Sequence, residues 1–269
     1  MRRVRQGAGG AGGIVFKVPS VPPIAPVGRE RLPATTVLDS MLDHSRNPLC
    51  LLRPAVTRPW PSASLRPEPQ GPAEVAAAGA LLEVSRLFTA LLRLTRPDIG
   101  LRTERITALV SFVVRGLELE RRWEFEVAAR LSQLGCLGIA PEILQAATRG
   151  ELLSDDDVRA VASHPLAARD LLADVNRLSA VGEMIARQHE PVGLVGEWLA
   201  PVTGEDRLTF GGQLLRVCGE FDRLVERGLS FQDAITRMTA QPEEFEPAIV
   251  ERLHACTAAA AADVSCPAA

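Results

Sequence analysis

LSQLGCLGIAPEIL, residues 131–144, is the stretch that decides the fold of this chain. It joins two segments whose apolar residues recur at helical spacing, 121–134 and 141–148. Gly135 and Gly138 lie where these segments meet, and they favour a tight turn between helices over a phosphate-binding loop. The stretch therefore predicts a close corner between two helices.

Helical spacing continues on both sides of this corner. A leucine-rich stripe covers 74–95, and further helices are predicted at 102–117, 155–162, 165–174, 177–189, 211–227, 231–239 and 244–255. Ser154 and Ser230 precede acidic residues as N-capping residues do, and Pro165 suits the first position of a helix. No strand with alternating apolar residues stands out after residue 73. The predicted fold class is all-α.

The two ends of the chain are predicted to lie outside this helical bundle. More than half of the 20 prolines precede residue 73, so residues 1–72 are predicted to be a Pro/Gly-rich, mostly disordered N-terminal extension. Residues 257–269 are predicted to be a disordered tail. Residues 73–98 are either a linker or a dimerisation helix, and residues 99–256 form the helical domain.

Charge and cysteine content exclude several classes of protein. Residues 1–72 carry ten basic and four acidic residues (+6), and the remainder carries 20 basic and 29 acidic residues (−9), which gives −3 in total. The acidic domain has no basic stripe, so nucleic acid is not an expected partner. The five cysteines lack CxxC spacing, and no apolar run approaches the ~20 residues of a membrane span. A cytoplasmic protein without a membrane partner is expected.

An ordered series of short motifs resembles the HD-GYP phosphodiesterases, a bacterial family of all-helical, metal-dependent phosphohydrolases of the HD superfamily. The stretch 131–144 resembles the signature H-D-I-G-K-I-G-I-P-D-E-I-L. Later motifs match in order over about 100–255: His164-Pro165 for H-P, Gln188-His189-Glu190 for H-H-E, residues 213–222 for R-I-L-A-V-A-D-A-F-D, and residues 245–247 for F-D-P. The resemblance implies an HD-domain-like helical bundle.

The resemblance also implies a metal centre, which in many members cleaves cyclic di-GMP, but most of its positions hold other residues here. These are Arg102 for the first His, Ser132 and Gln133 for the H-D pair, Cys136 for the Lys, Gln188 for the first His of H-H-E, and Gly219 for the late Asp. The G-Y-P loop is missing as well. His164 and His189 remain, and two imidazoles without a bridging carboxylate cannot hold two cations about 3.5–4 Å apart.

Several of these residues have a structural as well as a functional interpretation. His164 and His189 are the candidate metal ligands, yet zinc normally takes three or four ligands, and backbone bonding is favoured for His164. Cys136 and Cys218 are favoured as small core residues over a thiol pair or a metal thiolate. Arg102 in the vacated pocket would repel a cation and attract an anion, so Arg102, His164 and His189 form a candidate anion site. No catalytic residue, metal or cofactor is assigned.

We therefore expect a pseudoenzyme, a non-catalytic regulatory or interaction module of bacterial signal transduction derived from an HD-GYP phosphodiesterase. Its expected partner is a signalling protein, and a cyclic dinucleotide and a second copy of the chain are further candidates. The alternative function is a residual phosphohydrolase that uses a divalent metal to act on cyclic di-GMP or a related phosphoester. A nucleotide sensor that binds without cleaving is the third hypothesis.

Overall fold

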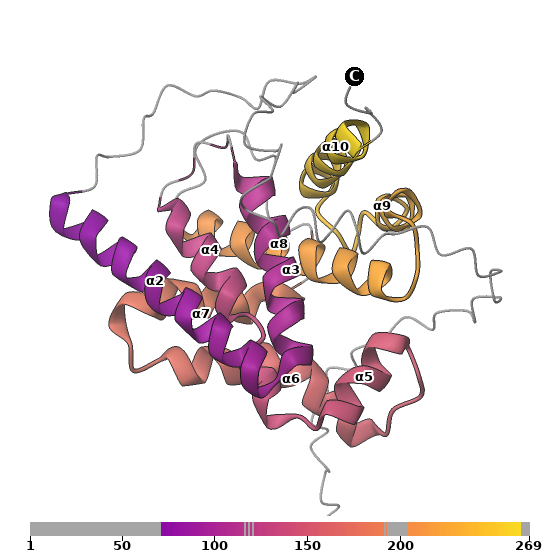
Figure 1. Cartoon of the computed structure of the whole chain (residues 1–269), viewed down its shortest axis with the longest axis horizontal. Helices are drawn as coiled ribbons and strands as arrows, with labels where there is room; N and C mark the ends of the chain where they lie inside the picture. The colour runs from indigo at the N-terminus through magenta and orange to yellow at the C-terminus, as the bar shows by residue number, and fades with distance from the viewer. Residues whose placement is uncertain are drawn as a thin grey trace, which may run out of the picture. The chain divides into compact units, whose positions relative to one another are not determined.

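The computed structural model describes residues 71–264 except 116, 118, 120, 191 and 193–203. These residues form helices and connecting turns without a strand, which confirms the all-α fold class (Figure 1). The described helices belong to one compact unit, Leu32–Ala269. Of the predicted extension 1–72, only the last two residues are described, so its disorder stays a prediction.

The helices are named here in chain order. The α-helices are α2 (Pro72–Thr95), α3 (Pro97–Val114), α4 (Arg122–Leu131), α5 (Pro141–Arg149), α6 (Asp155–Leu172), α7 (Ser179–Ala186), α8 (Gly204–Glu226), α9 (Phe231–Thr239) and α10 (Pro247–Val264). Short 3-10 helices connect some of them: η2 (Leu134–Gly138), η3 (Asn176–Leu178) and η4 (Arg187–His189). Ser154 and Ser230 accept hydrogen bonds from the backbone N–H of Asp157 and Asp233, which confirms both predicted N-caps.

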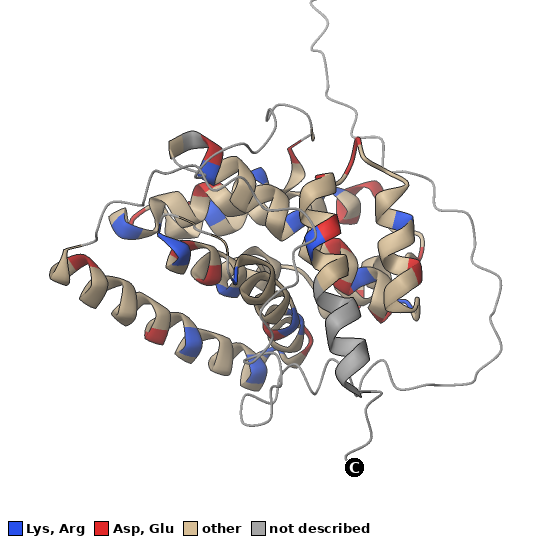
Figure 2. Cartoon of the chain, turned by 90° about the horizontal axis from the view of Figure 1, so that it is seen from above, with Lys and Arg blue, Asp and Glu red and all other residues tan. Residues whose placement is uncertain are grey.

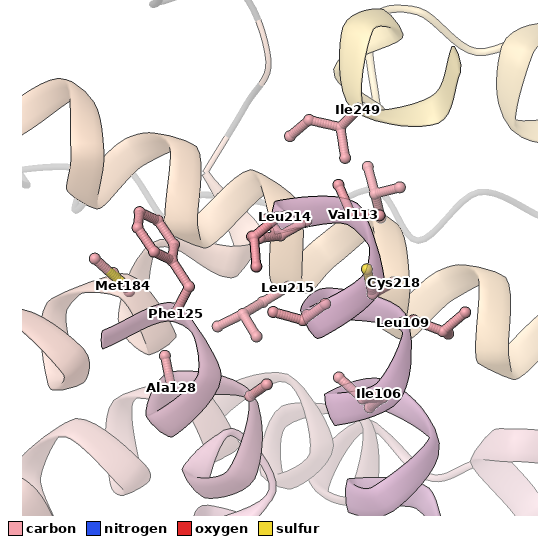
Figure 3. Packing of buried hydrophobic residues seen from close by; sticks show 14 of the residues in the cluster. Ile106, Leu109, Val113, Phe125, Ala128, Met184, Leu214, Leu215, Cys218 and Ile249 are labelled. Carbon is pink, nitrogen blue, oxygen red and sulfur yellow. The ribbon is translucent and has the colours of Figure 1, made fainter. Parts of the chain in front are cut away.

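The main core lies where α3, α4, α7 and α8 meet. Buried residues of α3 recur at 106, 109, 110, 113 and 114, a spacing that puts them on one helix face. Leu214, Leu215 and Cys218 of α8 belong to the same buried cluster as Phe125 of α4 (Figure 3). The rings of Phe125 and Phe210 meet edge to face with their centroids 5.8 Å apart. This packing holds α3 against α8, and both helices carry residues of the candidate site.

Helix α6 runs unbroken through Pro165, whereas the sequence predicts two helices, 155–162 and 165–174. Proline has no N–H, so the carbonyl of Val161, four residues earlier, loses its helical donor. Nδ1 of His164 lies 2.6 Å from that carbonyl oxygen and replaces the missing donor. The prediction that Pro165 begins a helix is wrong, because this side-chain hydrogen bond satisfies the carbonyl that the proline leaves unpaired.

Helix α10 runs to Val264, past residue 257, where the disordered tail is predicted to begin. Residues 258–262 are all alanine, the residue with the highest helix propensity, and they continue the helix. The boundary predicted at 256 is therefore too early. Residues 265–269 lie outside the described part of the chain.

Helix α2 lies at the edge of the bundle, where it packs on α3 and α4 (Figure 1, Figure 2). By length and composition alone, α2 is long and apolar enough to cross a membrane, but it contains Glu74, Glu83, Arg86 and Arg93. Its Ser85, Thr89 and Leu92 are buried against the bundle, as in a docked helix of a globular domain. Residues 72–95 form one continuous helix within the range 73–98 that was predicted to be a linker or a dimerisation helix, and that choice stays a prediction.

Candidate functional site

The corner at 131–144 packs directly on the part of α6 that carries His164. A Cβ built on Gly135 would lie 1.9 Å from the carbonyl oxygen of His164 and 3.1 Å from the backbone nitrogen of Ala168. Only glycine allows two backbone segments to approach this closely. The predicted role of Gly135 in a tight corner is confirmed, since η2 follows α4 and turns the chain toward α5.

Ser132, Gln133 and Cys136, at the H-D and Lys positions of the resemblance, interact with one another. Ser132 Oγ donates to the backbone carbonyl of Ala129 at 2.9 Å, and Gln133 Nε2 donates to Ser132 Oγ at 3.3 Å. Cys136 Sγ lies 3.7 Å from Gln133 Oε1. Ser132 and Gln133 are buried. Their polar atoms therefore serve hydrogen bonds within the corner itself.

The cysteines of the site region are buried thiols. Burial raises the pKa of the Cys136 thiol to about 11, and the nearby guanidinium of Arg102 offsets only part of this effect. Cys136 is therefore protonated at neutral pH. Cys136 and Cys218 are both buried, and they lie in different buried clusters. Their placement agrees with the interpretation as core residues.

Arg102 reaches from α3 to α8. Its Nη2 donates to the carbonyl oxygen of Gly219 at 3.3 Å, and its Nε lies 3.9 Å from a carboxylate oxygen of Asp222. No described atom lies within 4 Å of a Cβ built on Gly219, so a side chain at this position would meet open space. The charge of Arg102 also acts on Cys136 and His164. A guanidinium thus lies among the predicted site positions.

His164 and His189 lie against each other, edge to face, with ring centroids 5.9 Å apart. Burial lowers the pKa of His164 to about 4; the hydrogen bond to Val161 opposes this shift, and the charges of His189 and Arg102 add to it. Burial also lowers the pKa of His189. Both rings are therefore neutral at neutral pH.

The tautomer of His164 follows from its hydrogen bond. A carbonyl oxygen only accepts, so Nδ1 carries the proton that is donated to Val161, and Nε2 has a lone pair. Nε2 is buried and has no hydrogen-bond partner among the described residues. His164 thus presents an acceptor to its surroundings, while a bound phosphate would require a donor.

The structure brings together most of the positions that the sequence singles out. We define the central cluster as Arg102, Cys136, His164, His189 and Gly219, which are linked by the contacts and charge effects described above. Ser132 and Gln133 lie in the corner beside Cys136. Gln188 lies next to His189 in η4, and its buried Nε2 has no hydrogen-bond partner in the described part of the chain.

The ion pair that anchors this cluster was not predicted from the sequence. Arg105 Nε donates to a carboxylate oxygen of Asp222 at 2.5 Å, and Arg105 Nη2 lies 3.4 Å from Glu226. The side chain of Asp222 is only 1% exposed, so it needs such a partner. A signal was present, because Arg102 and Arg105 are three residues apart on one helix face and Asp222 ends the motif at 213–222.

The residues at these positions do not fit the metal centre that the HD-GYP resemblance implies. Divalent ions of such centres take carboxylate and imidazole ligands, whereas Ser132 and Gln133 offer a hydroxyl and an amide that already bond to each other. The guanidinium of Arg102 adds positive charge where a cation would bind. Among the described residues, no three His, Cys, Asp or Glu side chains are grouped so that they could hold a metal ion.

Comparison with known proteins identifies the family. A family model described as HD domain matches residues 86–248, which is more than half of the chain. A search of curated proteins finds no match. The matched range contains the corner at 131–144 and every residue of the central cluster. The chain therefore belongs to the HD domain family.

Proposed function

We propose that this HD domain is a pseudoenzyme, a non-catalytic regulatory or interaction module of bacterial signalling that descends from an HD-GYP phosphodiesterase and acts by contact with a signalling protein. The observation that carries the proposal is the hydrogen bond from Arg102 to the carbonyl of Gly219. This contact fixes a permanent positive charge between α3 and α8. The HD-GYP resemblance implies a histidine ligand at position 102 and an aspartate ligand at position 219.

The charges around Arg102 oppose a divalent cation. Asp222 is the nearest carboxylate, but it already pairs with Arg105 at 2.5 Å, so the two arginines share one buried acid. Two unit charges about 4 Å apart repel by about 4 kcal/mol at the effective dielectric constant of a protein site, which makes about 8 kcal/mol for a divalent ion. The other candidate ligands in the central cluster are two neutral imidazoles, which carry no charge to offset that repulsion. They are also fewer than the three or four protein ligands that a zinc site normally needs.

Metal content and hydrolysis of the full chain test the proposal. After incubation with Mn²⁺ or Fe²⁺ and desalting, we expect substoichiometric metal by mass spectrometry. We also expect no hydrolysis of cyclic di-GMP or of bis-p-nitrophenyl phosphate. A bound metal pair together with hydrolysis would establish the alternative, a metal-dependent phosphohydrolase, and would overturn the proposal.

A variant with restored ligands tests whether the residues at positions 102, 133 and 219 prevent metal binding. Arg102→His, Gln133→Asp and Gly219→Asp together return two carboxylates and an imidazole to the site, and a side chain at 219 meets open space. We expect this triple variant to retain a metal ion that the wild-type chain loses on desalting. The control is Gly219→Asp alone, whose carboxylate should pair with Arg102 and hold no metal. Equal retention by wild type and triple variant would contradict the role given to Arg102.

An anion in the central cluster is a second candidate, favoured by the partial exposure of Arg102 and the open space at Gly219. Because His164 and His189 are neutral, they add no charge, and affinity would rest on Arg102. Calorimetry with cyclic di-GMP should then show micromolar binding that Arg102→Ala weakens by about tenfold, the equivalent of one charge-assisted hydrogen bond. The exposed Arg86→Ala is the control, and the absence of any heat would eliminate this candidate.

A further inference from the structure

The outer face of α2 is apolar along most of its length. Val84, Leu87, Leu91 and Leu94 are 63%, 62%, 50% and 80% exposed. Together with the exposed Ala80, these residues recur at intervals of four, three, four and three. We name these five residues the α2 seam. An average interval of 3.5 residues is the repeat with which one helix packs along another.

The inner face of α2 contrasts with the seam. The residues that it buries against the bundle are Ala78, Ser85, Thr89 and Leu92. Ser85 and Thr89 donate their hydroxyl protons back to carbonyls of the same helix. Leu92 is buried with these residues, and Leu81, Leu82 and Phe88 are partly buried against the core, so α2 is docked on the bundle by part of its apolar surface. Val84, Leu87, Leu91 and Leu94 remain exposed on the opposite face. Exposure of this many aliphatic groups in one stripe marks a binding surface.

The charges of α2 are neutralised within the same chain. Glu83 pairs with Arg86 at 2.5 Å, Arg93 with Glu104 at 2.7 Å, and Glu74 with Arg121 at 3.2 Å. Figure 2 shows these few charged positions on an otherwise uncharged helix. A highly charged partner or an anionic membrane surface would find no free charge of α2 to recognise. A second copy of the same seam meets no like-charge repulsion.

The seam is also complementary to itself in antiparallel orientation. When Val84 of one copy lies opposite Leu87 of the other, Ala80 lies opposite Leu91, and Leu94 lies opposite Ala77, which is half-buried and lies beyond the end of the seam. Alanine then faces leucine toward both ends of the contact and valine faces leucine at its centre, so smaller side chains lie opposite larger ones.

A hollow beside the seam provides room for a side chain of the second copy. It has a volume of about 210 Å³ and is lined by Leu81, Val84, Ser85, Phe88, Val127, Leu131, Leu134, Leu172 and Leu178. Apolar cavities of about 150 Å³ accept a group as large as benzene. Val84 belongs to both the seam and the hollow, so the hollow borders the seam.

We propose that α2 is a homodimerisation helix, whose seam packs antiparallel on the seam of a second copy of this chain. In this register residues 76–95 of the two helices overlap over about 30 Å, so two strips about 10 Å wide bury about 600 Å² together. This area is below the about 1,200 Å² of a stable standard interface. The expected dimer is therefore weak, with a dissociation constant in the micromolar range.

Sedimentation equilibrium of the full chain across the micromolar range tests this proposal. Leu91→Glu, at a seam position that is 50% exposed, should raise the dissociation constant at least about tenfold, because it places a charge in an apolar contact. The matched control is Leu166→Glu on α6, at a position that is 47% exposed and outside the seam and hollow. It should leave the dissociation constant unchanged. Circular dichroism verifies that both variants keep the helical fold.

Three results would overturn the proposal. The first is a wild-type chain that stays monomeric throughout the range. The second is a Leu91→Glu variant that dimerises as tightly as the wild type. The third is a wild-type chain that co-sediments with phosphatidylcholine vesicles while Leu91→Glu does not, since the occupant of the seam would then be a membrane surface.

Discussion

Replacement of Gly135 by alanine should destabilise this HD domain more than an ordinary surface substitution does. The added Cβ would lie 1.9 Å from the carbonyl oxygen of His164, whereas ordinary van der Waals contact begins near 3.4 Å. Relief of the clash requires η2 and α6 to separate by more than an ångström. The obstacle is backbone, which cannot rotate away as the end of a side chain can.

Overpacking in a well-packed interior costs about 1–3 kcal/mol, and a clash with backbone belongs at the upper end of that range. For a domain of this size, about 3 kcal/mol corresponds to a fall of about 6–12 °C in Tm, at about 2–4 °C per kcal/mol. The loss should appear as a lower Tm in calorimetry and a lower urea midpoint at unchanged m-value.

Gly138→Ala is the matched control within the same turn. No described atom lies within 4 Å of a Cβ built on Gly138, and its φ is not positive. The alanine should therefore be neutral or stabilise the protein by up to about 1 kcal/mol, because it restricts the unfolded chain. If Gly135→Ala and Gly138→Ala unfold at the same temperature, the close contact between η2 and α6 does not exist and the placement of the central cluster is wrong.

Two further predictions concern buried charge. The pKa of His164 is about 6.5 in the unfolded chain and about 4 in the folded chain. The free energy of unfolding is therefore unaffected by this residue above pH 6.5, and it falls as the pH drops toward 4, by at most about 3 kcal/mol. Urea midpoints at pH 7 and pH 5 should differ less for His164→Asn than for the wild type, and an identical difference would contradict burial of a neutral ring. Asp222→Ala should cost about 3 kcal/mol, because it removes the buried carboxylate between Arg102 and Arg105 and leaves Arg105 only the more exposed Glu226. The exposed pair of Arg86 and Glu83 is the control, and Arg86→Ala should cost no more than about 0.5 kcal/mol. Equal losses of unfolding free energy for the two variants in chemical denaturation would refute the special role of Asp222.

Local signals in the sequence predicted the helices that begin at strong start residues. Ser230 caps α9, and the predicted range 231–239 is the range observed. Pro141 begins α5, which is predicted at 141–148 and observed to Arg149. In both cases the residue that fixes the helix start lies within the helix or next to it, so no tertiary contact is needed to locate it.

Other features depend on contacts that no local pattern contains. The sequence places a helix boundary at Pro165, but the bond between the His164 ring and the Val161 carbonyl keeps α6 continuous. The start of α3 at Pro97 precedes the predicted start at 102. Pro97 at the first helical position is a local start signal that the apolar spacing does not contain, and Ile99 is buried with Leu92 of α2. The sharing of Asp222 by two arginines joins α3 to α8 across more than 100 residues of sequence, and only the folded chain shows it.

The bond of His164 to Val161 has a consequence beyond this chain. The histidine here repairs the hydrogen-bond gap that the following proline opens in its own helix. Folding alone is then sufficient reason to retain a His-Pro pair, whether or not the chain binds a metal. The presence of such a histidine in an HD domain is therefore weak evidence for a metal centre, and neighbouring carboxylates are the better measure.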